Sequence, residues 1–504
     1  MPGVGSQPQS HSSETKTVIV KAEGTRQKAE TALPGYHARM TLRMLAITVV
    51  LGVSLCVTPT YSADSFDKKE FGARRSRLME KIGDGAAVIL GAQTRADDND
   101  FRQGHDFFYL TGLELPDAVL VVDGLRKESV LFFTMDEATA DGYAIPLDLI
   151  RKPVDYSGIE RAMPADQFGA QLTGFVNRNR VIYTMFKPEE LGRENSNETF
   201  NALQKSMTQN PWDGRLTREL QFVKQLRERY PQADVRDSSP IVWNLRKYKT
   251  AAELALMREA ARIGVEGHKA LIASTRAGVA EKALAAVFSF VTMKAGAQDL
   301  AYSTIIMSGK NHAYGHYHEH DRVLNDGDFV ILDAAPDYRN YHVDISTTFP
   351  ASGKFSARQK ELYEAALAVH DVAVENYRPG TTFKEVGLKV DALLKARGLD
   401  RFTDDFRGIV RLGGYNHSIG LATHDVMGTF AGADEVLQPG FVFACDIQLF
   451  RRDEQIGIRI EDTVAITETG HEILSAGLPR TVAEIEALMK TDGILQILKK
   501  NGGS

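Results

Sequence analysis

The chain has little cysteine, no excess of positive charge and no long hydrophobic run, and each shortage argues against a class of protein. With 2 cysteines in 504 residues, it is not a disulfide scaffold. A formal net charge of -6 offers no basic surface, so neither nucleic acid nor an anionic membrane is an expected partner. The apolar run at residues 44–57 is too short to span a bilayer.

That short apolar run has the flanks of an export signal. Arg39 and Arg43 precede it, and small residues follow it as far as Ala63. The pattern predicts a signal peptide over residues 40–63, while a buried core helix is disfavoured because β-branched residues weaken a helix interior. We therefore expect an exported protein, periplasmic or secreted, with no membrane anchor once the signal is cleaved.

The residues before the signal are polar and have no apolar period. Residues 1–39 predict a disordered extension, or a mis-assigned start if translation begins at Met40 and not at Met1. Cleavage near residue 63 leaves Cys445 as the one remaining cysteine. Because no intramolecular disulfide is then available, the fold must be stabilised by burial or by bound metal.

The rest of the chain is long enough for two cores. Short apolar runs between residues 84 and 135, separated by Gly, Pro and Asp, predict strands of an α/β domain over residues 64–240. A second domain is expected over residues 241–504, where Thr250 and Glu253 form a capping box at the start of a long helix.

The second domain shows the same order of elements twice. Helices are expected at 250–274 and 280–295, and two more begin at the capping residues Ser356 and Thr382. Strands are expected near residues 302–308, 328–348, 407–413, 440–447 and 456–467. A helix pair followed by strands, twice, predicts two related halves that enclose a site.

Acidic residues end or interrupt apolar strands in both halves. Asp333 and Asp344 flank a plausible turn and could face each other across a hairpin. Asp446 follows FVFAC, and Glu461 lies in IGIRIEDTVAIT. One such residue alone is more simply a solvated turn residue, but four favour bound cations, because buried carboxylates are costly when unpaired.

His417 adds one imidazole to these four carboxylates. A mostly oxygen donor set suits harder divalent ions such as Mn(II) or Fe(II) better than tetrahedral zinc. Two ions would also neutralise four negative charges in one place, so the pattern favours a dinuclear site.

The same residues resemble a known family. The flanking motifs HVDISTTFP, LQPGFVF and GIRIEDTVAIT are similar to those of dinuclear pita-bread metallopeptidases, most of all aminopeptidase P, the Xaa-Pro aminopeptidases. FRQGHDFFYLTGLELPDAVLVV at residues 101–122 resembles the amino-terminal domain of that family, which methionine aminopeptidases lack. The resemblance covers roughly residues 67–490. It implies an α/β amino-terminal domain and an α+β pita-bread catalytic domain with pseudo-twofold halves.

The resemblance also implies roles for single residues. The implied metal ligands are Asp333, Asp344, His417, Asp446 and Glu461. They would hold two divalent ions, Mn(II) first, with Fe(II), Co(II) or Zn(II) as alternatives. The implied catalytic groups are His316, His424 and Glu461, which would act on a metal-bridging hydroxide and on the substrate carbonyl. Arg459 and His318 are candidate substrate contacts, whereas His312, His318 and His320 are not expected to be primary ligands.

Two positions depart from the family pattern. Asp446 stands where the family has a glutamate, and Gly413 stands where it has a histidine, so strict proline selectivity is in doubt. The activity that the resemblance implies is metal-dependent release of the first residue from short peptides with proline in the second position. The implied assembly is a homodimer or homotetramer. The alternatives are another small-amide hydrolase or lyase on this fold, a prolidase, and a non-catalytic periplasmic binder of metal or peptide.

Overall fold

The computed structural model describes residues 66–93, 101–187, 206–207, 209–426 and 432–502. By its contacts Thr60–Ser504 forms one compact unit, to which all the described residues belong. The predicted extension and signal peptide, residues 1–63, lie outside the described residues. No helix in the described part combines the length and the hydrophobicity that a membrane crossing requires.

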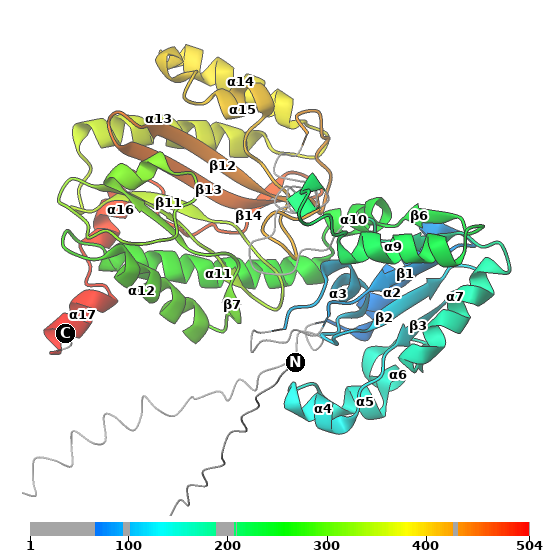
Figure 1. Cartoon of the computed structure of the whole chain (residues 1–504). Coiled ribbons are helices and arrows are strands. Elements are labelled where there is room, and N and C mark those ends of the chain that lie inside the picture. Colours follow the sequence, from blue (N-terminus) through cyan, green and yellow to red (C-terminus); the bar gives the residue numbers. More distant parts are fainter. Residues whose placement is uncertain (1–65, 94–100, 188–205, 208, 427–431, 503–504) are drawn as a thin grey trace, which may run out of the picture. The chain divides into compact units, whose positions relative to one another are not determined.

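The amino-terminal part of the larger unit contains a six-stranded mixed sheet in the order β4-β3-β2-β1-β5-β6 (Figure 1). Its strands are β1 Ala86–Leu90, β2 Val119–Asp123, β3 Glu128–Phe132, β4 Arg161–Met163, β5 Ile182–Thr184 and β6 Val235–Asp237. The apolar runs expected as strands form β1, β2 and β3. The longer helices that pack on this sheet are α2 Lys68–Ile82, α3 His105–Thr111, α7 Phe168–Val176 and α9 Arg218–Arg229, and the shorter helices are α4 Glu137–Gly142, α5 Leu147–Arg151, α6 Pro153–Ser157 and η2 Ala165–Gln167.

Both faces of this sheet are covered, and the side chains of β1 alternate between them. Ala87 and Ile89 pack in one cluster with Phe71 of α2 and Phe107 of α3. The residues between and beside them pack in a second cluster with α7 and α9. This is the period of two expected for a strand that is buried on both sides, and it explains the continuous apolar run.

A second sheet has the order β12-β13-β11-β9-β8, with β14 paired to β13, and all of its pairs are antiparallel. Its strands are β8 Ile305–Ser308, β9 Phe329–Asp333, β11 Ser346–Pro350, β12 Val442–Arg451, β13 Ile456–Ile466 and β14 His471–Ile473. A separate two-stranded pair joins β7 Asp299–Leu300 to β10 Pro336–Asp337.

Helix pairs precede the strands of each half, as predicted. The elements are α10 Ser239–Lys247, α11 Ala251–Ser274, α12 Glu281–Lys294, α13 Ala357–Asn376, α14 Phe383–Ala396, α15 Arg407–Leu412, α16 Val482–Met489 and α17 Ile494–Lys500, with the short η3 Gly309–Ala313 and η4 Asp400–Phe402. Figure 1 shows α13 along one side of the sheet and α11 along the other. The capping boxes at Thr250, Ser356 and Thr382 are all formed.

The strand expected near residues 407–413 is wrong, because this segment forms the helix α15. Its β-branched Ile409 and Val410 favoured a strand, but Val410 N donates to Phe406 O at 3.0 Å, a helical spacing. The helix ends at Gly413, which has a left-handed φ of 82°. Glycine at that position is a helix stop, and this signal outweighs the propensity of a run of six residues.

The strand expected over residues 328–348 is interrupted. Residues 342–345 lie outside the sheet, so a continuous strand over 328–348 is wrong. His342 N donates to Gly420 O at 2.9 Å, and Asp344 N donates to Thr463 Oγ1 at 2.8 Å. Side-chain and loop partners therefore replace the strand pairing over these residues.

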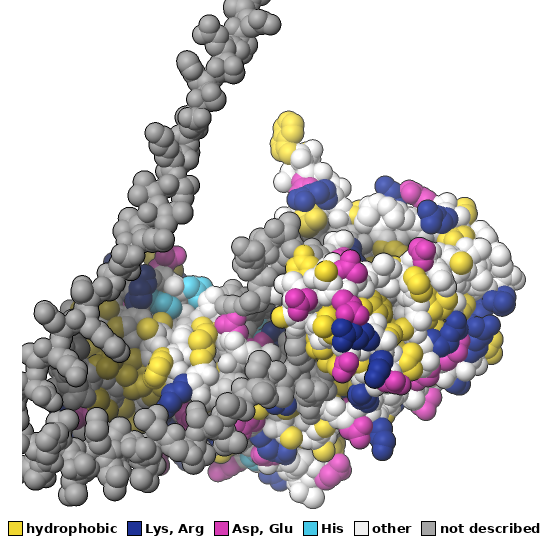
Figure 2. Space-filling model, turned by 90° about the horizontal axis from the view of Figure 1, so that it is seen from below, with side chains coloured by type: hydrophobic (Ala, Val, Ile, Leu, Met, Phe, Trp, Pro, Cys, Tyr) yellow, Lys and Arg dark blue, Asp and Glu magenta, His cyan; other side chains and the backbone are white. Residues whose placement is uncertain are grey.

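Charged side chains of both signs are interspersed on the face shown in Figure 2.

The contacts within Thr60–Ser504 define one compact unit. The boundary near residue 240 therefore stays a prediction from the sequence.

Candidate active site

Four neighbouring strands bring three of the predicted carboxylates into one row. Asp333 of β9 pairs with Ser346 of β11, which pairs with Glu461 of β13. Asp446 of β12 pairs with Glu461 from the other side. Directly opposite residues project from the same face of a sheet about 4.5–5.5 Å apart at their Cβ atoms. The register therefore gathers the acidic side chains, and one of its pairs, Ser346 with Glu461, joins residues 115 positions apart.

Asp344 joins this row from the segment before β11. It does not stand opposite Asp333 in the sheet, because Ser346 occupies that position. The two carboxylates are instead linked by Tyr302, whose hydroxyl lies 2.6 Å from an Oδ1 atom of each. The predicted proximity of the two aspartates is correct, although the simple hairpin pairing is not.

Asp344, His417 and Glu461 form a compact cluster of ligand-type atoms. One atom from each lies within 4.8 Å of the others. His417 Nε2 is 3.3 Å from Asp344 Oδ2 and 3.8 Å from Glu461 Oε1. Its Nδ1 lies 3.0 Å from the carbonyl oxygen of Thr423 and donates to it. That contact fixes the ring so that Nε2 faces the carboxylates, as in metal-binding histidines.

Asp333 and Asp446, the two remaining predicted ligands, are connected through Arg459. The Arg459 Nη1 atom pairs with Asp333 Oδ2, and its Nε lies 4.0 Å from Asp446 Oδ1. Gln448 donates to the other oxygen of Asp446. Asp446 Oδ1 is buried and has no hydrogen-bond partner among the described residues. Arg459 therefore contacts carboxylates of the cluster, whereas its predicted contact with substrate stays a prediction.

The electrostatics of the site disfavour so many negative charges. Burial, followed by repulsion from Glu461, raises the pKa of Asp446 to about 8. Burial and the neighbouring carboxylates also raise the pKa values of Asp344 and Glu461. Although burial opposes it, hydrogen bonding to Asp344 and Glu461 raises the pKa of His417 to about 10. The cluster therefore retains protons, and a bound cation could take their place.

The donor set fits divalent cations. All five predicted ligands are buried, and a buried carboxylate is costly unless a cation or a hydrogen bond compensates it. The unpartnered oxygen of Asp446 accepts no hydrogen bond from any described donor, and Nε2 of His417 can coordinate once it loses its proton to the solvent. Four carboxylates and one imidazole form an oxygen-rich set of the kind that hard divalent ions prefer.

Two further histidines lie beside the cluster. The rings of His417 and His424 are 4.0 Å apart between centroids. Burial lowers the pKa of His424 well below its usual range, with His417 and His316 as further causes, so His424 is a neutral donor. His316 is exposed. The structure thus places both predicted catalytic histidines next to the cluster and not within it.

The other histidines of the NHAYGHYHEH segment contact the backbone. His312 is buried, with Nε2 2.7 Å from Met307 O, and its Nδ1 accepts from Gly457 N at 2.6 Å. His318 and His320 both face Thr304 O, at 3.4 and 2.8 Å. Residues 314–320 do not form a strand.

Sequence reasoning missed the polar residues that orient the ligands. Tyr302 joins two aspartates, Ser346 Oγ donates to Glu461 Oε2 at 2.7 Å, and the carbonyl of Thr423 orients His417. Single hydroxyl and carbonyl groups have no spacing pattern. Only their contacts in the folded structure identify them.

Gly413, the second departure from the family pattern, is required by the backbone. Its φ is 82°, and an added Cβ would lie 2.4 Å from Phe383 Cβ. A histidine cannot occupy this position unless α15 and α14 move apart. The local packing therefore explains why glycine, and not histidine, stands at position 413.

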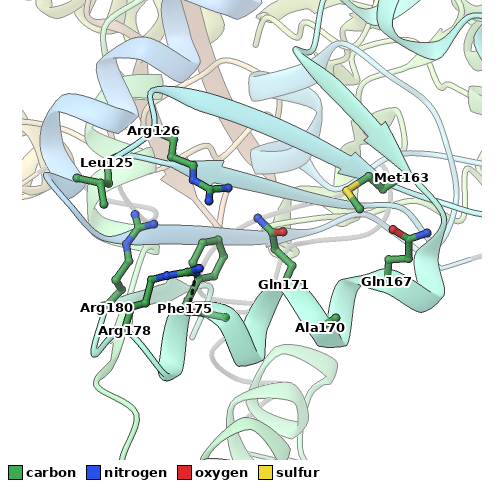
Figure 3. Close-up of a pocket in the computed structure, with 10 residues that line it drawn as sticks. Leu125, Arg126, Met163, Gln167, Ala170, Gln171, Phe175, Arg178 and Arg180 are labelled. Atoms are coloured by element: carbon green, nitrogen blue, oxygen red, sulfur yellow. Dashed lines mark hydrogen bonds between the residues drawn. The ribbon is translucent and has the colours of Figure 1, made fainter.

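A pocket of about 660 Å³ lies elsewhere, between α7 and the turn that joins β2 to β3 (Figure 3). Its walls carry cationic, amide and apolar side chains from Leu125, Arg126, Met163, Gln167, Ala170, Gln171, Gly174, Phe175, Arg178 and Arg180. It contains none of the predicted site residues, so it is separate from the carboxylate cluster.

The fold and the buried cluster together define a metallopeptidase with two domains, and comparison with known proteins agrees. The family model described as aminopeptidase P, N-terminal domain, matches residues 71–183, and that of metallopeptidase family M24 matches residues 255–468. The Xaa-Pro aminopeptidase of Escherichia coli (strain K12) is 31% identical over 451 residues, which cover 84% of this chain and 98% of the relative. The mitochondrial intermediate cleaving peptidase 55 of Arabidopsis thaliana is 28% identical, with 84% and 83% covered.

Solved structures give the same result. Proline aminopeptidase P II from Yersinia pestis has a TM-score of 0.68 and 30% identity, and the match covers 84% of this chain and 100% of the other. Aminopeptidase P from E. coli has a TM-score of 0.68 and 29% identity, with 84% and 98% covered. The chain belongs to the aminopeptidase P family of M24 metallopeptidases. The predicted family, the fold class of an amino-terminal domain with a pita-bread catalytic domain, and the metalloaminopeptidase class are confirmed.

Proposed function

We propose that this protein releases the amino-terminal residue from short peptides with proline in the second position. The observation that carries the proposal is the buried cluster of Asp344, His417 and Glu461, which a metallopeptidase needs and which a chain without a cation would hold at a cost. Relatives named Xaa-Pro aminopeptidase support the proline preference.

The proposed ligands are Asp333, Asp344, His417, Asp446 and Glu461, and the proposed cofactor is a pair of divalent ions, Mn(II) in the first place. The oxygen-rich donor set supports Mn(II) over Zn(II). Divalent ions bound there would polarise the peptide carbonyl and lower the pKa of a water molecule.

The chain's own residues supply the remaining steps. In this proposal Glu461 accepts the proton that the attacking water loses. The hydrogen bond that Ser346 Oγ donates to Glu461 Oε2 at 2.7 Å supports this role, because it holds the carboxylate in one orientation. His424 and His316 donate to the carbonyl oxygen, on which negative charge develops. Arg459 and His318 stay proposed substrate contacts, and Arg459 also restrains the Asp333 carboxylate.

The test is to incubate the full chain, loaded with Mn(II), with tripeptides that differ only in the second residue. We expect release of the first residue from Xaa-Pro-Xaa, loss of release with EDTA, and at least about a hundredfold loss in the Asp344→Asn variant. Equal cleavage of Xaa-Ala peptides would remove the proline preference but leave the aminopeptidase. Cleavage of dipeptides alone would indicate a prolidase.

Metal binding without any release would favour the non-catalytic binder. Turnover of a small amide in place of peptides would favour another hydrolase of this fold. Including Tyr317→Phe as a variant outside the proposed machinery controls for general damage, because the Tyr317 hydroxyl contacts Asp321 and none of the proposed ligands.

We also propose that the protein is exported to the periplasm or secreted, and that it forms a homodimer or homotetramer. The basic, apolar and small-residue pattern of residues 40–63 supports export. Mass spectrometry of the mature amino terminus after expression from Met1 and from Met40 tests the cleavage site, and sedimentation velocity tests the assembly. A chain that keeps residue 40 and stays in the cytosolic fraction would contradict export.

A further inference from the structure

Arg102 belongs to the amino-terminal part of the chain but reaches residues around the ligand cluster. Its Nη1 pairs with the carboxylate of Asp337. Its Nη2 lies 3.0 Å from the carbonyl oxygen of Leu421 and 3.0 Å from Nε2 of His342. The side chain is 13% exposed. A guanidinium is planar, so three acceptors in a buried setting hold it in one orientation.

The contact with His342 determines the tautomer of that ring. Arginine has only hydrogens to offer, so Nε2 must accept and the ring proton must lie on Nδ1. Nδ1 is 3.1 Å from Thr423 Oγ1 and donates to it. The Asp337 carboxylate also lies 3.3 Å from Nε2, but the guanidinium is nearer. His342 therefore links Arg102 to Thr423 through one hydrogen bond at each ring nitrogen.

The next contact reaches the ligand cluster. The carbonyl of Thr423 accepts from Nδ1 of His417 at 3.0 Å, which leaves Nε2 facing Asp344 and Glu461. The backbone N of His342 also donates to Gly420 O at 2.9 Å. The loop Gly420–His424 is thus held at Gly420, Leu421 and Thr423.

We propose that Arg102 is a positioning residue for His417: it fixes the loop Gly420–His424, and so it sets the affinity of the ligand cluster for divalent ions. The inference deepens the proposed function and rests on its ligand assignment. It makes the amino-terminal part of the chain a component of the metal site, although that part provides none of the proposed ligands.

Arg180 provides a matched control. Its side chain is 7% exposed, and its Nη2 lies 2.7 Å from Asp123 Oδ1 and 2.7 Å from the carbonyl oxygen of Gly85. Removing either arginine leaves a buried aspartate without its cation, so both Arg102→Leu and Arg180→Leu lower the thermal midpoint. Only the first breaks contacts with Leu421 and His342.

The experiment titrates metal-stripped full chain with Mn(II) by calorimetry and records the visible spectrum of the Co(II) form. We expect Arg102→Leu to bind Mn(II) about tenfold more weakly and to shift the Co(II) bands. Arg180→Leu should stay within about twofold of the parent chain and keep its spectrum. Arg102→Lys keeps the charge but has one nitrogen in place of Nη1 and Nη2, so it should bind Mn(II) about threefold more weakly than the parent chain.

The inference is overturned if Arg102→Leu binds Mn(II) as tightly as Arg180→Leu does. If Arg102→Leu does not fold, Arg102→Lys decides in its place, and parental affinity and spectrum in that variant overturn the inference. Metal binding is measured without peptide. A parent chain that binds Mn(II) but releases no residue would therefore refute the proposed function and leave the role of Arg102 standing.

Discussion

Asp446 is shorter by one methylene than the glutamate expected from the family pattern, and one of its oxygens has no hydrogen-bond partner in the part of the chain that the structure describes. We predict that Asp446→Glu binds Mn(II) several-fold more tightly, because the carboxylate reaches further into the cluster. The extra methylene in a packed site should cost the metal-free protein about 1–3 kcal/mol. Calorimetric titration and thermal unfolding measure both effects. Asp446→Gln has the same length without the charge, and equal affinities in the two variants would contradict the prediction.

Tyr302 shares its hydroxyl between Asp333 and Asp344, at 2.6 Å from each. Burial and the two carboxylates raise the pKa of Tyr302 well above its usual range, so it remains a donor. We predict that Tyr302→Phe destabilises the metal-free protein by about 1.5–3 kcal/mol, the usual worth of hydrogen bonds to charged groups.

Saturating Mn(II) should reduce the loss caused by Tyr302→Phe, because the cations then compensate the same carboxylates. Urea unfolding with EDTA and with Mn(II) makes the comparison. Tyr363→Phe is a suitable control, since its buried hydroxyl donates to the carbonyl of Arg480 and to no carboxylate. A loss that Mn(II) leaves unchanged would show that Tyr302 acts through packing alone.

At the scale of elements, α15 ends at Gly413, whose hydrogen atom faces Phe383 of α14. We predict that Gly413→Ala loses about 1–2 kcal/mol through its left-handed backbone and about 1–3 kcal/mol more through the clash with Phe383. Gly413→His should be worse still and should not increase proline selectivity. Urea unfolding and the ratio of Xaa-Pro to Xaa-Ala cleavage measure the two outcomes.

Gly380→Ala separates the two causes, because Gly380 has a φ of 86° and open space around its hydrogen atom. It should show the backbone cost without the clash. If Gly380→Ala and Gly413→Ala are equally destabilised, the contact with Phe383 does not limit the residue at position 413.

Local signals predicted the helices and apolar strands well. The capping boxes at Thr250, Ser356 and Thr382 each depend on residues three positions apart, and all of them are formed. The segment at residues 407–413 failed because a six-residue run carries too little period to separate helix from strand. The partners of the interrupted segment 342–345 come from loops and strands far along the chain, which no local pattern contains.

At the scale of the whole molecule, the sequence predicted which residue types gather at the site, and the structure added how they are held. Acidic residues beside apolar strands in both halves were sufficient to indicate Asp333, Asp344, Asp446 and Glu461. The row across four strands and the contacts from Arg102 depend on sheet register and on packing between the two parts of the chain. Those are long-range properties, and therefore Tyr302 and Arg102 could not be predicted.

The ligand cluster also sets how the stability of the metal-free protein varies with pH. Burial and mutual repulsion raise the carboxyl pKa values of Asp344 and Glu461, and that of Asp446 to about 8. Carboxyls titrate near pH 4 in the unfolded chain. Between these limits the three carboxyls bind more protons in the folded state than in the unfolded state, so their contribution to the free energy of unfolding falls as the pH rises. Buried histidines with lowered pKa values, such as His268 and His312, oppose this contribution below about pH 7, where they would be protonated only in the unfolded chain. The protonated His417, with a pKa of about 10, acts in the same direction at higher pH.

We predict that the metal-stripped full chain loses about 2 kcal/mol or more of unfolding free energy between pH 7 and pH 9, where Asp446 and His417 titrate and the buried neutral histidines no longer contribute. Saturating Mn(II) should reverse the slope, because the ligands must lose their protons to bind metal. Urea titrations at both pH values, with EDTA and with Mn(II), measure the difference. Asp446→Asn removes the carboxyl with the highest of these pKa values, so its metal-free slope between pH 7 and pH 9 should be shallower. A metal-free protein that is more stable at pH 9 than at pH 7 would mean that the carboxylates are compensated within the protein, and the case for cations at this site would lose its electrostatic basis.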